Sequence, residues 1–118
     1  MSREARIMML HYITGLVIIV AGAIHLATVF LVSPYEESLR FDNTPWSVIN
    51  VYRNSLLAGS LEALLLAVAF HGFNGLRVIL LELHQGRTWT RAVNVAVTVA
   101  AIAVVINGTK TIFIASML

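Results

Sequence analysis

Cysteine is absent from the sequence and charged residues are scarce, and each shortage narrows the possibilities. Without cysteine the chain cannot form a disulfide, bind a metal through thiolates or attach a c-type haem. Only 12% of the residues are charged, roughly half the share found in soluble domains. A monomer with so few charges cannot cover its surface with polar groups in water. The net charge of +2 comes from a few dispersed arginines, so we expect no nucleic-acid partner.

The sequence contains long apolar runs and few charged residues. Hydrophobic residues make up 58% of the chain. They gather in three runs, about 7–32, 55–83 and 92–117, which each exceed the roughly 20 residues needed to span a bilayer. Because lipid cannot satisfy exposed backbone groups, such runs must be helices. We therefore predict an all-α integral membrane protein, a three-helix bundle that forms a single membrane domain over residues 1–118.

The connections between the runs differ in length. The second, residues 84–91, is short and basic, so the second and third helices should be antiparallel neighbours. In the first connection, Trp46 and Tyr52 are expected at the level of the lipid headgroups. That connection covers residues 33–54, and we expect a solvated loop because it contains the turn-forming and charged residues Pro34, Glu36, Glu37, Asp42, Asn43 and Pro45.

Arginines are distributed unequally over the two sides of such a bundle. The N-terminus and the second connection share one side, which carries Arg3, Arg6, Arg87 and Arg91, whereas the other side carries two arginines and three acidic residues. Cytoplasmic segments of membrane proteins are enriched in lysine and arginine. We therefore expect a multi-pass protein of the cell (inner) membrane with its N-terminus in the cytoplasm and its C-terminus outside.

Two histidines and two glycines share one face of the first helix. His25 follows His11 by fourteen residues, which places the two roughly 40° apart around a helix. Gly15 and Gly22 lie on the same face. Such a stripe allows close approach either of a flat macrocycle or of a neighbouring helix whose packing the histidines support by hydrogen bonds. The residues alone leave both interpretations open.

His71 lies in the apolar middle of the second run, with Gly75 one turn further along the same face. A neutral imidazole can bind haem iron, and a glycine one turn away leaves room for the porphyrin. The alternative is a buried histidine with packing duties alone. Arg77 follows towards the cytoplasmic end, where its guanidinium could reach a haem propionate or extend to the interface.

Other polar residues lie near the helix ends. Glu82 and His84 mark the end of the second helix, and His84 is expected to be solvated. Glu62 and Lys110 lie in the outer half of the second and third helices. They could pair with each other, or a partner subunit could satisfy either one.

Two segments resemble the cytochrome b membrane anchors of succinate dehydrogenase. Residues 10–15, LHYITG, with His25 ten residues later, resemble the first-helix pattern His-Arg/Lys-x-Ser/Thr-Gly. Residues 70–82, FHGFNGLRVILLE, resemble the more specific second-helix pattern His-Gly-x-Asn-Gly-x-Arg-x-x-Leu-x-Asp. The resemblance covers three helices in topology and two of them in motif, and the first-helix motif favours the first of the two anchor subunits.

The resemblance implies a non-catalytic subunit of a succinate:quinone oxidoreductase. The chain would be half of a larger transmembrane bundle, completed by a second membrane anchor subunit. Together the two anchors would hold a flavoprotein subunit and an iron–sulfur subunit, bind one or two haem b groups between them and pass electrons from succinate to membrane quinone. Lipid and quinone would surround the chain. No substrate chemistry would take place in this chain alone.

The resemblance also implies roles for single residues. His71 matches the haem iron ligand of the second helix, and His25 matches the additional ligand of two-haem members. Gly15, Gly22 and Gly75 would face the haem. The vicinity of the haem propionates and the quinone would contain His11, Tyr12, Thr14, Arg77 and Glu82. Tyr12 stands where the family usually has arginine or lysine, and Glu82 stands where aspartate is usual.

Two other functions stay open at this stage. One is the anchor of a fumarate reductase or another b-type cytochrome complex, which would have nearly the same structure. The other belongs to a different class: a small helical scaffold or transporter protomer without haem, whose histidines pack or move protons.

Overall fold

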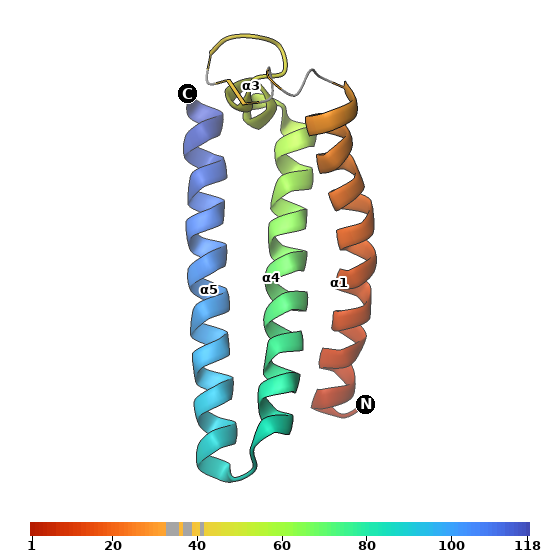
Figure 1. Ribbon diagram of the computed structural model, residues 1–118, viewed down its shortest axis with the longest axis vertical. Coiled ribbons are helices and arrows are strands. Elements are labelled where there is room, and N and C mark those ends of the chain that lie inside the picture. Colours follow the sequence, from red (N-terminus) through yellow and green to blue (C-terminus); the bar gives the residue numbers. More distant parts are fainter. Residues whose placement is uncertain (33–35, 37–38, 41) are drawn as a thin grey trace.

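A computed structural model describes residues 1–32, 36, 39–40 and 42–118, and the regular elements in these residues are all helical. The long helices are α1 (Arg3–Leu26), which continues as the π-helical segment η1 (Ala27–Val32), α4 (Ser55–Leu83) and α5 (Arg87–Met117). All three are long and apolar enough to cross a membrane. A short helix, α3 (Val48–Arg53), precedes α4 (Figure 1). The prediction of an all-α membrane bundle of three helices is confirmed.

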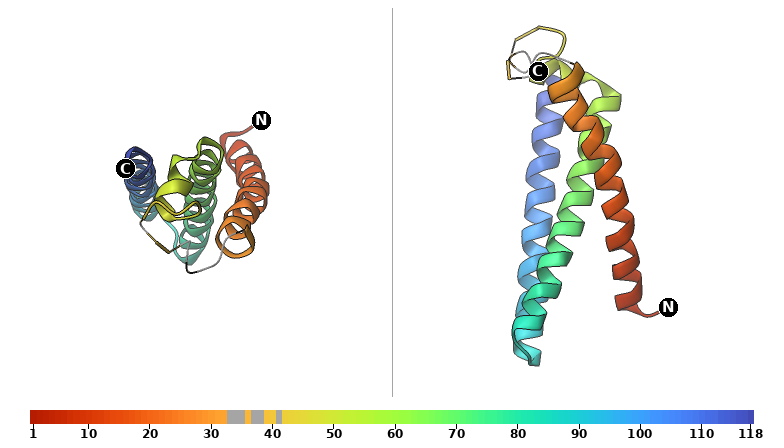
Figure 2. Two further views of the ribbon diagram at one scale, coloured as in Figure 1. Left: turned by 90° about the horizontal axis from the view of Figure 1, so that it is seen from above. Right: turned by 45° about the vertical axis from the view of Figure 1, so that its right-hand side comes forward.

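Each long helix runs antiparallel to the next one in the sequence. The helix α4 lies between α1 and α5 and packs against both (Figure 2). We call the end with the N-terminus and the α4–α5 turn the hairpin end, and the end with α3 and the C-terminus the loop end (Figure 1). The N-terminus lies short of the tip of the α4–α5 turn (Figure 1). The turn therefore projects beyond the level at which α1 begins.

Small side chains fill the contacts between the helices. The buried apolar residues of the described chain are alanines and valines, whereas many large apolar side chains point outward, with Leu31 84% exposed. At Gly108 the approach is so close that an added Cβ would lie 2.5 Å from Leu65 Cδ2. Large apolar groups facing outward and small groups between helices are typical of proteins in lipid, where burial of apolar area does not drive association.

Polar side chains fix where the helices begin. Ser2 caps α1 by accepting from the Ala5 N–H, and Asn54 caps α4 by accepting from the N–H groups of Leu56 and Leu57. These bonds satisfy backbone donors that have no partner within the helix. Gly86 precedes α5 with a φ of +123°, which favours glycine. The turn before it is therefore tight, and α5 begins at Arg87, five residues before the apolar run expected from the sequence.

The connection at the loop end contains more structure than the predicted solvated loop. Ser47 is completely buried, donates to the Asp42 backbone oxygen and caps α3 by accepting from the Asn50 N–H. Asp42 accepts from both the N–H and the hydroxyl of Thr44, and these bonds lower the pKa of its carboxyl below the ordinary value of 3.8. Arg53 at the end of α3 donates to the backbone oxygen of Leu118. The turn residues Pro34 and Glu37 lie outside the described part of the chain.

Candidate functional site

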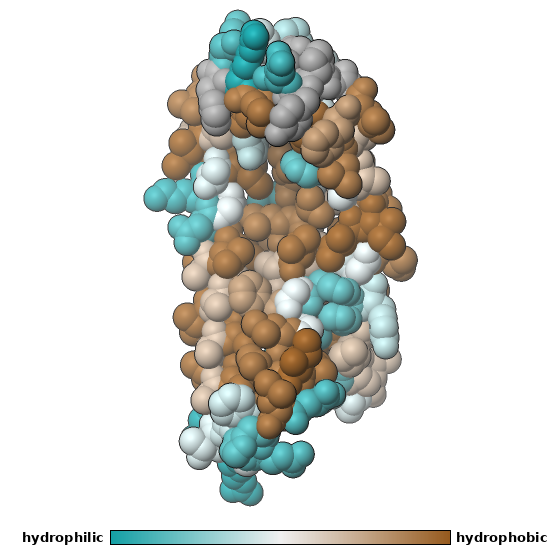
Figure 3. All heavy atoms as spheres, in the orientation of Figure 1, coloured by the Kyte–Doolittle hydropathy of each residue, from teal (hydrophilic) through white to brown (hydrophobic). Residues whose placement is uncertain are grey.

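A cluster of polar side chains lies where α1 crosses α4, in the half of the bundle nearer the hairpin end. The imidazoles of His11 and His71 stack there with their centroids 3.8 Å apart and their planes 16° from parallel. Figure 3 shows a hydrophilic patch between α1 and α4 in this half of the molecule, surrounded by apolar surface. Residues sixty positions apart in the sequence thus meet inside the membrane-spanning region.

Two glycines make the stacking possible. A Cβ at Gly15 would lie 3.3 Å from His71 Cε1, and a Cβ at Gly75 would lie 3.7 Å from His11 Cε1. Each histidine therefore packs over a glycine of the opposite helix. Both glycines were predicted to leave room for a haem, and in this chain the space directly above them is occupied by the two imidazoles. Whether they also face a haem stays a prediction.

The hydrogen bonds of His71 define its tautomer. Its Nδ1 lies 2.9 Å from the backbone oxygen of His11 and 3.5 Å from the Thr14 hydroxyl, which itself donates to the backbone oxygens of Leu10 and His11. Because a carbonyl oxygen can only accept, Nδ1 carries a proton, and in the neutral form of this imidazole the lone pair is on Nε2. Nε2 has no hydrogen bond within the described chain. Every buried side-chain nitrogen of the described chain has a hydrogen-bond partner, so Nε2 is not buried and lies at the chain's surface.

A chain of polar bonds continues from His11 towards the hairpin end. Asn74, which is 6% exposed, donates from Nδ2 to His11 Nδ1 at 3.2 Å and accepts at Oδ1 from Arg77 Nε at 3.2 Å. Arg77 also donates to Asn94 of α5 at 3.4 Å and to Glu4 of α1 at 3.1 Å. Since the arginine fixes the orientation of the Asn74 amide, His11 Nδ1 must accept and its Nε2 carries the proton. Arg77 thus joins all three long helices.

Three other predicted residues lie outside this network. Tyr12 is 69% exposed, and its ring stands edge-on to that of His11 at 6.2 Å. Glu82 is exposed near the end of α4, and its carboxylate has no partner among the described residues. Gly22 faces Leu64 of α4, whose Cδ1 would lie 3.9 Å from an added Cβ. Of these three residues, Tyr12 is the one that lies beside the histidine pair.

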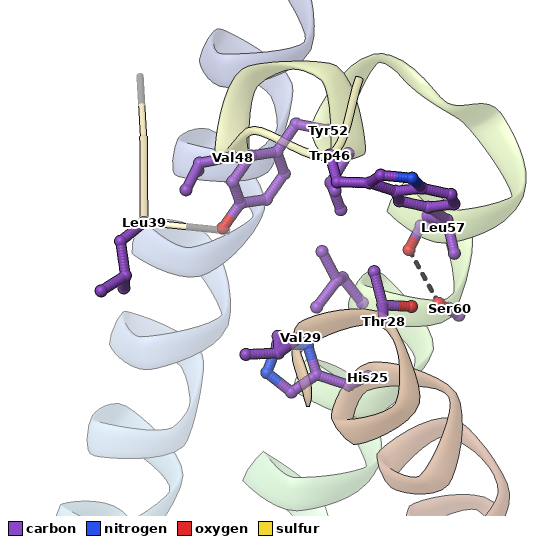
Figure 4. Close-up of a pocket in the computed structure, with 11 residues that line it drawn as sticks. His25, Thr28, Val29, Leu39, Trp46, Val48, Tyr52, Leu57 and Ser60 are labelled. Atoms are coloured by element: carbon purple, nitrogen blue, oxygen red, sulfur yellow. Dashed lines mark hydrogen bonds between the residues drawn. The ribbon is translucent and has the colours of Figure 1, made fainter. Parts of the chain in front are cut away.

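His25 is separated from the pair and lines a cavity of about 220 Å³ at the loop end. Ten residues separate it from Gly15, which corresponds to about 15 Å along α1. Its imidazole makes no hydrogen bond to the part of the chain that is described. Figure 4 shows residues of α1 and η1 below the cavity and residues of the loop and α3 above it, namely His25, Thr28 and Val29 against Trp46, Val48 and Tyr52.

The acidic and basic residues in the loop-end half of the spans do not form a pair. Glu62 of α4 accepts a hydrogen bond from the Thr109 hydroxyl at 2.7 Å. No ion pair between Glu62 and Lys110 is present among the described residues, and Lys110 is exposed. The sequence suggested that Glu62 could pair with Lys110 or with a partner subunit. In the structure Glu62 instead accepts its hydrogen bond from Thr109.

Three residues of the network had no assigned role in the sequence analysis: Glu4, Asn74 and Asn94. Asn74 offered a signal, since it lies three residues after His71 and three before Arg77, where side chains of one helix face meet. Asn94 is a polar residue in an otherwise apolar run, which indicates a partner within the bundle. Glu4 carried no signal, because an acidic residue in a first helical turn is common for other reasons.

The side chains of the histidine cluster limit which metal groups it could bind. No group of three or more His, Cys, Asp or Glu side chains that could hold a bare metal ion occurs in the described ranges. What the cluster offers is a single neutral imidazole with a free lone pair at the chain surface. Haem iron needs no more than this from one chain, because the porphyrin supplies its other four nitrogens.

Comparison with known proteins gives one match. The family model described as succinate dehydrogenase/fumarate reductase transmembrane subunit matches residues 4–106. Comparisons with curated proteins and with solved structures give no significant match. The matched range runs from the first turn of α1 to about two thirds of the way along α5 and contains the complete histidine cluster.

Proposed function

The chain belongs to the family of succinate dehydrogenase/fumarate reductase transmembrane subunits, and on this premise we propose that it is a haem b-binding anchor of a succinate:quinone oxidoreductase. A membrane subunit of this family implies partner subunits. In our proposal these are a flavoprotein and an iron–sulfur subunit, which carry the succinate chemistry, and a second membrane anchor, which completes the transmembrane bundle.

The observation that carries the proposal is the hydrogen bond from His71 Nδ1 to the His11 backbone oxygen at 2.9 Å. Histidines that bind a metal almost always donate their other ring N–H to a carbonyl, a carboxylate or water, which fixes the tautomer and the ring orientation. His71 has this arrangement. Its Nε2 has no partner within the described chain and reaches the chain surface.

In this role His71 would hold the haem iron through Nε2, together with a residue of the partner anchor. The bound haem would supply one-electron storage at a potential set by its ligands and its apolar surroundings. The residues of this chain would position the ligand. The His11 carbonyl holds the His71 ring, and Asn74 and Arg77 hold the His11 ring in turn. The donor Nδ1 also gains electron density from its carbonyl partner, which strengthens ligation through Nε2.

We propose that quinone approaches the same region. Among the residues assigned to its vicinity, Tyr12 has an exposed hydroxyl and His11 has a protonated Nε2 without a partner in the described chain. Either group can donate a hydrogen bond to a quinone carbonyl. The Thr14 hydroxyl donates to backbone oxygens of its own helix, and Arg77 uses three of its N–H groups for Asn74, Asn94 and Glu4. Tyr12 is therefore the residue best placed to take the position that arginine or lysine has elsewhere in the family.

Two further parts of the proposal concern the ends of the bundle. The hairpin end carries Arg3, Arg6, Arg87 and Arg91, so we place it on the cytoplasmic side. His25 lies about 15 Å further along α1 than Gly15, towards the loop end, and would bind a second haem. Its imidazole is unused within the described chain, which supports this assignment.

Haem analysis of the purified complex tests the proposal. His71→Ala should abolish the reduced-minus-oxidised signal of the haem bound near the hairpin end, and His25→Ala should halve the haem content measured as pyridine haemochrome. His84→Ala is the matched control, because His84 is exposed beside the α4–α5 turn and its ring packs edge-on against Trp89, away from both proposed haem ligands. Haem-free wild-type complex, or an unchanged spectrum in His71→Ala, contradicts the assignment and favours a scaffold without haem.

A further inference from the structure

A continuous groove runs between α1 and α5 across the surface of α4. It consists of two cavities of about 610 and 270 Å³ that share Phe70, Ala101 and Ile102. The larger cavity is nearer the loop end and the smaller one is nearer the hairpin end. We call the two cavities together the α1–α5 groove.

The chemistry of the α1–α5 groove changes along its length. The larger cavity is almost entirely apolar, with walls that include Leu10, Val17, Leu66, Ile102, Val105 and Ile106. The smaller cavity adds Arg3, Asn74, Arg77, Asn94 and Thr98 to apolar walls. A long apolar stretch thus ends in a polar and cationic section.

Further positive charge lies beside the polar section. A third cavity shares Asn94 with it and adds Arg87 and Arg91. The guanidinium groups of Arg3 and Arg91 have no partner in the part of the chain that the structure describes. Glu4 at this level is bound to Arg77, and no described Asp or Glu lines the three cavities. The polar section therefore has an excess of positive charge, with unused N–H donors.

The α1–α5 groove borders the histidine cluster but does not contain His71. Thr14 and Asn74 line its cavities, whereas His71 lines neither of them. Phe70 of the groove and His71 follow one another in the sequence, which places them about 100° apart around the helix. A ligand in the groove therefore makes no use of the proposed haem ligand.

The depth of the polar section matches that of a lipid headgroup. α1 begins at Arg3, short of the tip of the α4–α5 turn (Figure 1). Glu4 in the first turn of α1 bonds to Arg77 at 3.1 Å, so the two are at one level. The start of a membrane-spanning helix lies near the interface, and α4 with 29 residues is about 43 Å long and so exceeds the hydrocarbon thickness.

We propose that the α1–α5 groove binds an anionic phospholipid. Its phosphate accepts hydrogen bonds from Arg3, from the unused N–H groups of Arg77 and from Arg91 of the adjoining third cavity, and one acyl chain follows the apolar walls towards Ile106. Arginine forms strong, charge-assisted hydrogen bonds to phosphate oxygens. A choline headgroup would find no described acid lining the groove. A helix from a partner subunit would leave the arginines without an anion.

Native mass spectrometry of the detergent-purified complex tests the proposal. The complex is mixed with phosphatidylglycerol or phosphatidylcholine of the same chain length, and the retained lipid is counted. We expect wild type to retain phosphatidylglycerol several-fold more tightly, and Arg3→Gln/Arg91→Gln to lose this preference. Arg6→Gln is the control, because it removes a charge at the same end and Arg6 lines none of the three cavities. Equal retention of both lipids by wild type, or an equal loss in Arg6→Gln, overturns the proposal.

A second pair of variants tests the acyl-chain section. Ala101→Phe fills the segment shared by the two cavities, whereas Ala103→Phe adds the same ring on an exposed position outside them. Lipid retention should fall in the first variant alone. A density map of the complex in nanodiscs containing phosphatidylglycerol should show an elongated lipid in the groove. A protein helix in that position, or undiminished retention in Ala101→Phe, rules the proposal out.

Discussion

His71 and His11 are joined twice across the α1–α4 contact. The His71 Nδ1 donates to the His11 backbone oxygen at 2.9 Å, and the two rings stack with centroids 3.8 Å apart. The direction of the His71 lone pair therefore depends on how closely α1 and α4 approach. Changes that alter this approach should affect stability and ligand binding together.

Gly15 sets the distance between the two helices at this point. Gly15→Leu should displace the His71 ring, because a Cβ alone would already lie 3.3 Å from Cε1. We expect a loss of about 1–3 kcal/mol of stability, as for other overpacked sites, together with a weakened haem signal. Thermal unfolding and optical spectra of the complex measure both effects.

Gly59→Leu is the control for Gly15→Leu, since Gly59 is exposed and has no atom within 4 Å of an added Cβ. Both substitutions gain about 0.5–1 kcal/mol by removing a helical glycine. The control should therefore be neutral or slightly stabilised. Equal behaviour of the two variants would show that the imidazole does not need the space above Gly15.

Asn74 links the histidine pair to the arginine and is 6% exposed. Asn74→Leu removes the partners of His11 Nδ1 and Arg77 Nε, which are 3.2 Å from the amide. Leaving buried polar groups unpaired costs about 1–3 kcal/mol, so the unfolding temperature should fall. Asn107→Leu should have little effect, because Asn107 is exposed and its amide bonds to its own helix at Ala103. Similar unfolding temperatures for both variants would contradict the role of Asn74.

Arg77 and Glu4 form an ion pair whose two members differ in burial. The Arg77 side chain is 11% exposed and that of Glu4 is 64% exposed. Arg77→Lys should destabilise the bundle by about 1–3 kcal/mol, because an ammonium group cannot reproduce three directed bonds and leaves the Asn94 amide oxygen unpaired. Glu4→Gln should cost at most about 1 kcal/mol, as exposed ion pairs do. A double-mutant cycle measured by thermal unfolding gives both values, and a larger effect of Glu4→Gln would refute this ranking.

Asp42 at the loop end provides a pH test outside the membrane spans. Its pKa is lowered most by the hydrogen bond from the Thr44 hydroxyl and next by that from the Thr44 N–H. Arg40 at 3.9 Å and the backbone of Asp42 itself lower the pKa less. A lowered pKa in the folded state means that the carboxylate stabilises the loop above its ordinary pKa of 3.8. This contribution is lost as the pH falls through the lowered folded value.

Thr44→Val should raise the pKa of Asp42 towards 3.8, because it removes the hydroxyl donor and keeps the shape of the side chain. Thr44→Ser should retain the lowered value, and Arg40→Gln should shift it less than Thr44→Val does. Carbon-13 NMR titration of the Asp42 carboxyl in micelles measures all three. A larger shift in Arg40→Gln than in Thr44→Val would mean that charge, and not hydrogen bonding, controls this group.

The sequence by itself determined the class of the protein and the residues to examine. Three apolar runs longer than a bilayer is thick leave helices as the available backbone structure, and α4 covers the same residues, 55–83, as the second run. Polar residues within such runs are costly, so His11, His71 and Arg77 could be selected without coordinates. The family pattern in residues 70–82 identified the same segment.

Tertiary structure decided which of these residues meet. Periodicity places His71 on a helix face, but the distance and rotation between helices are set by small residues such as Gly15 and by contacts across the whole interface. These determine that His71 bonds to the His11 backbone, that Glu62 bonds to Thr109, and that His25 lies apart in a cavity of its own. A helical wheel describes one helix at a time, and hydrogen bonds between helices depend on both.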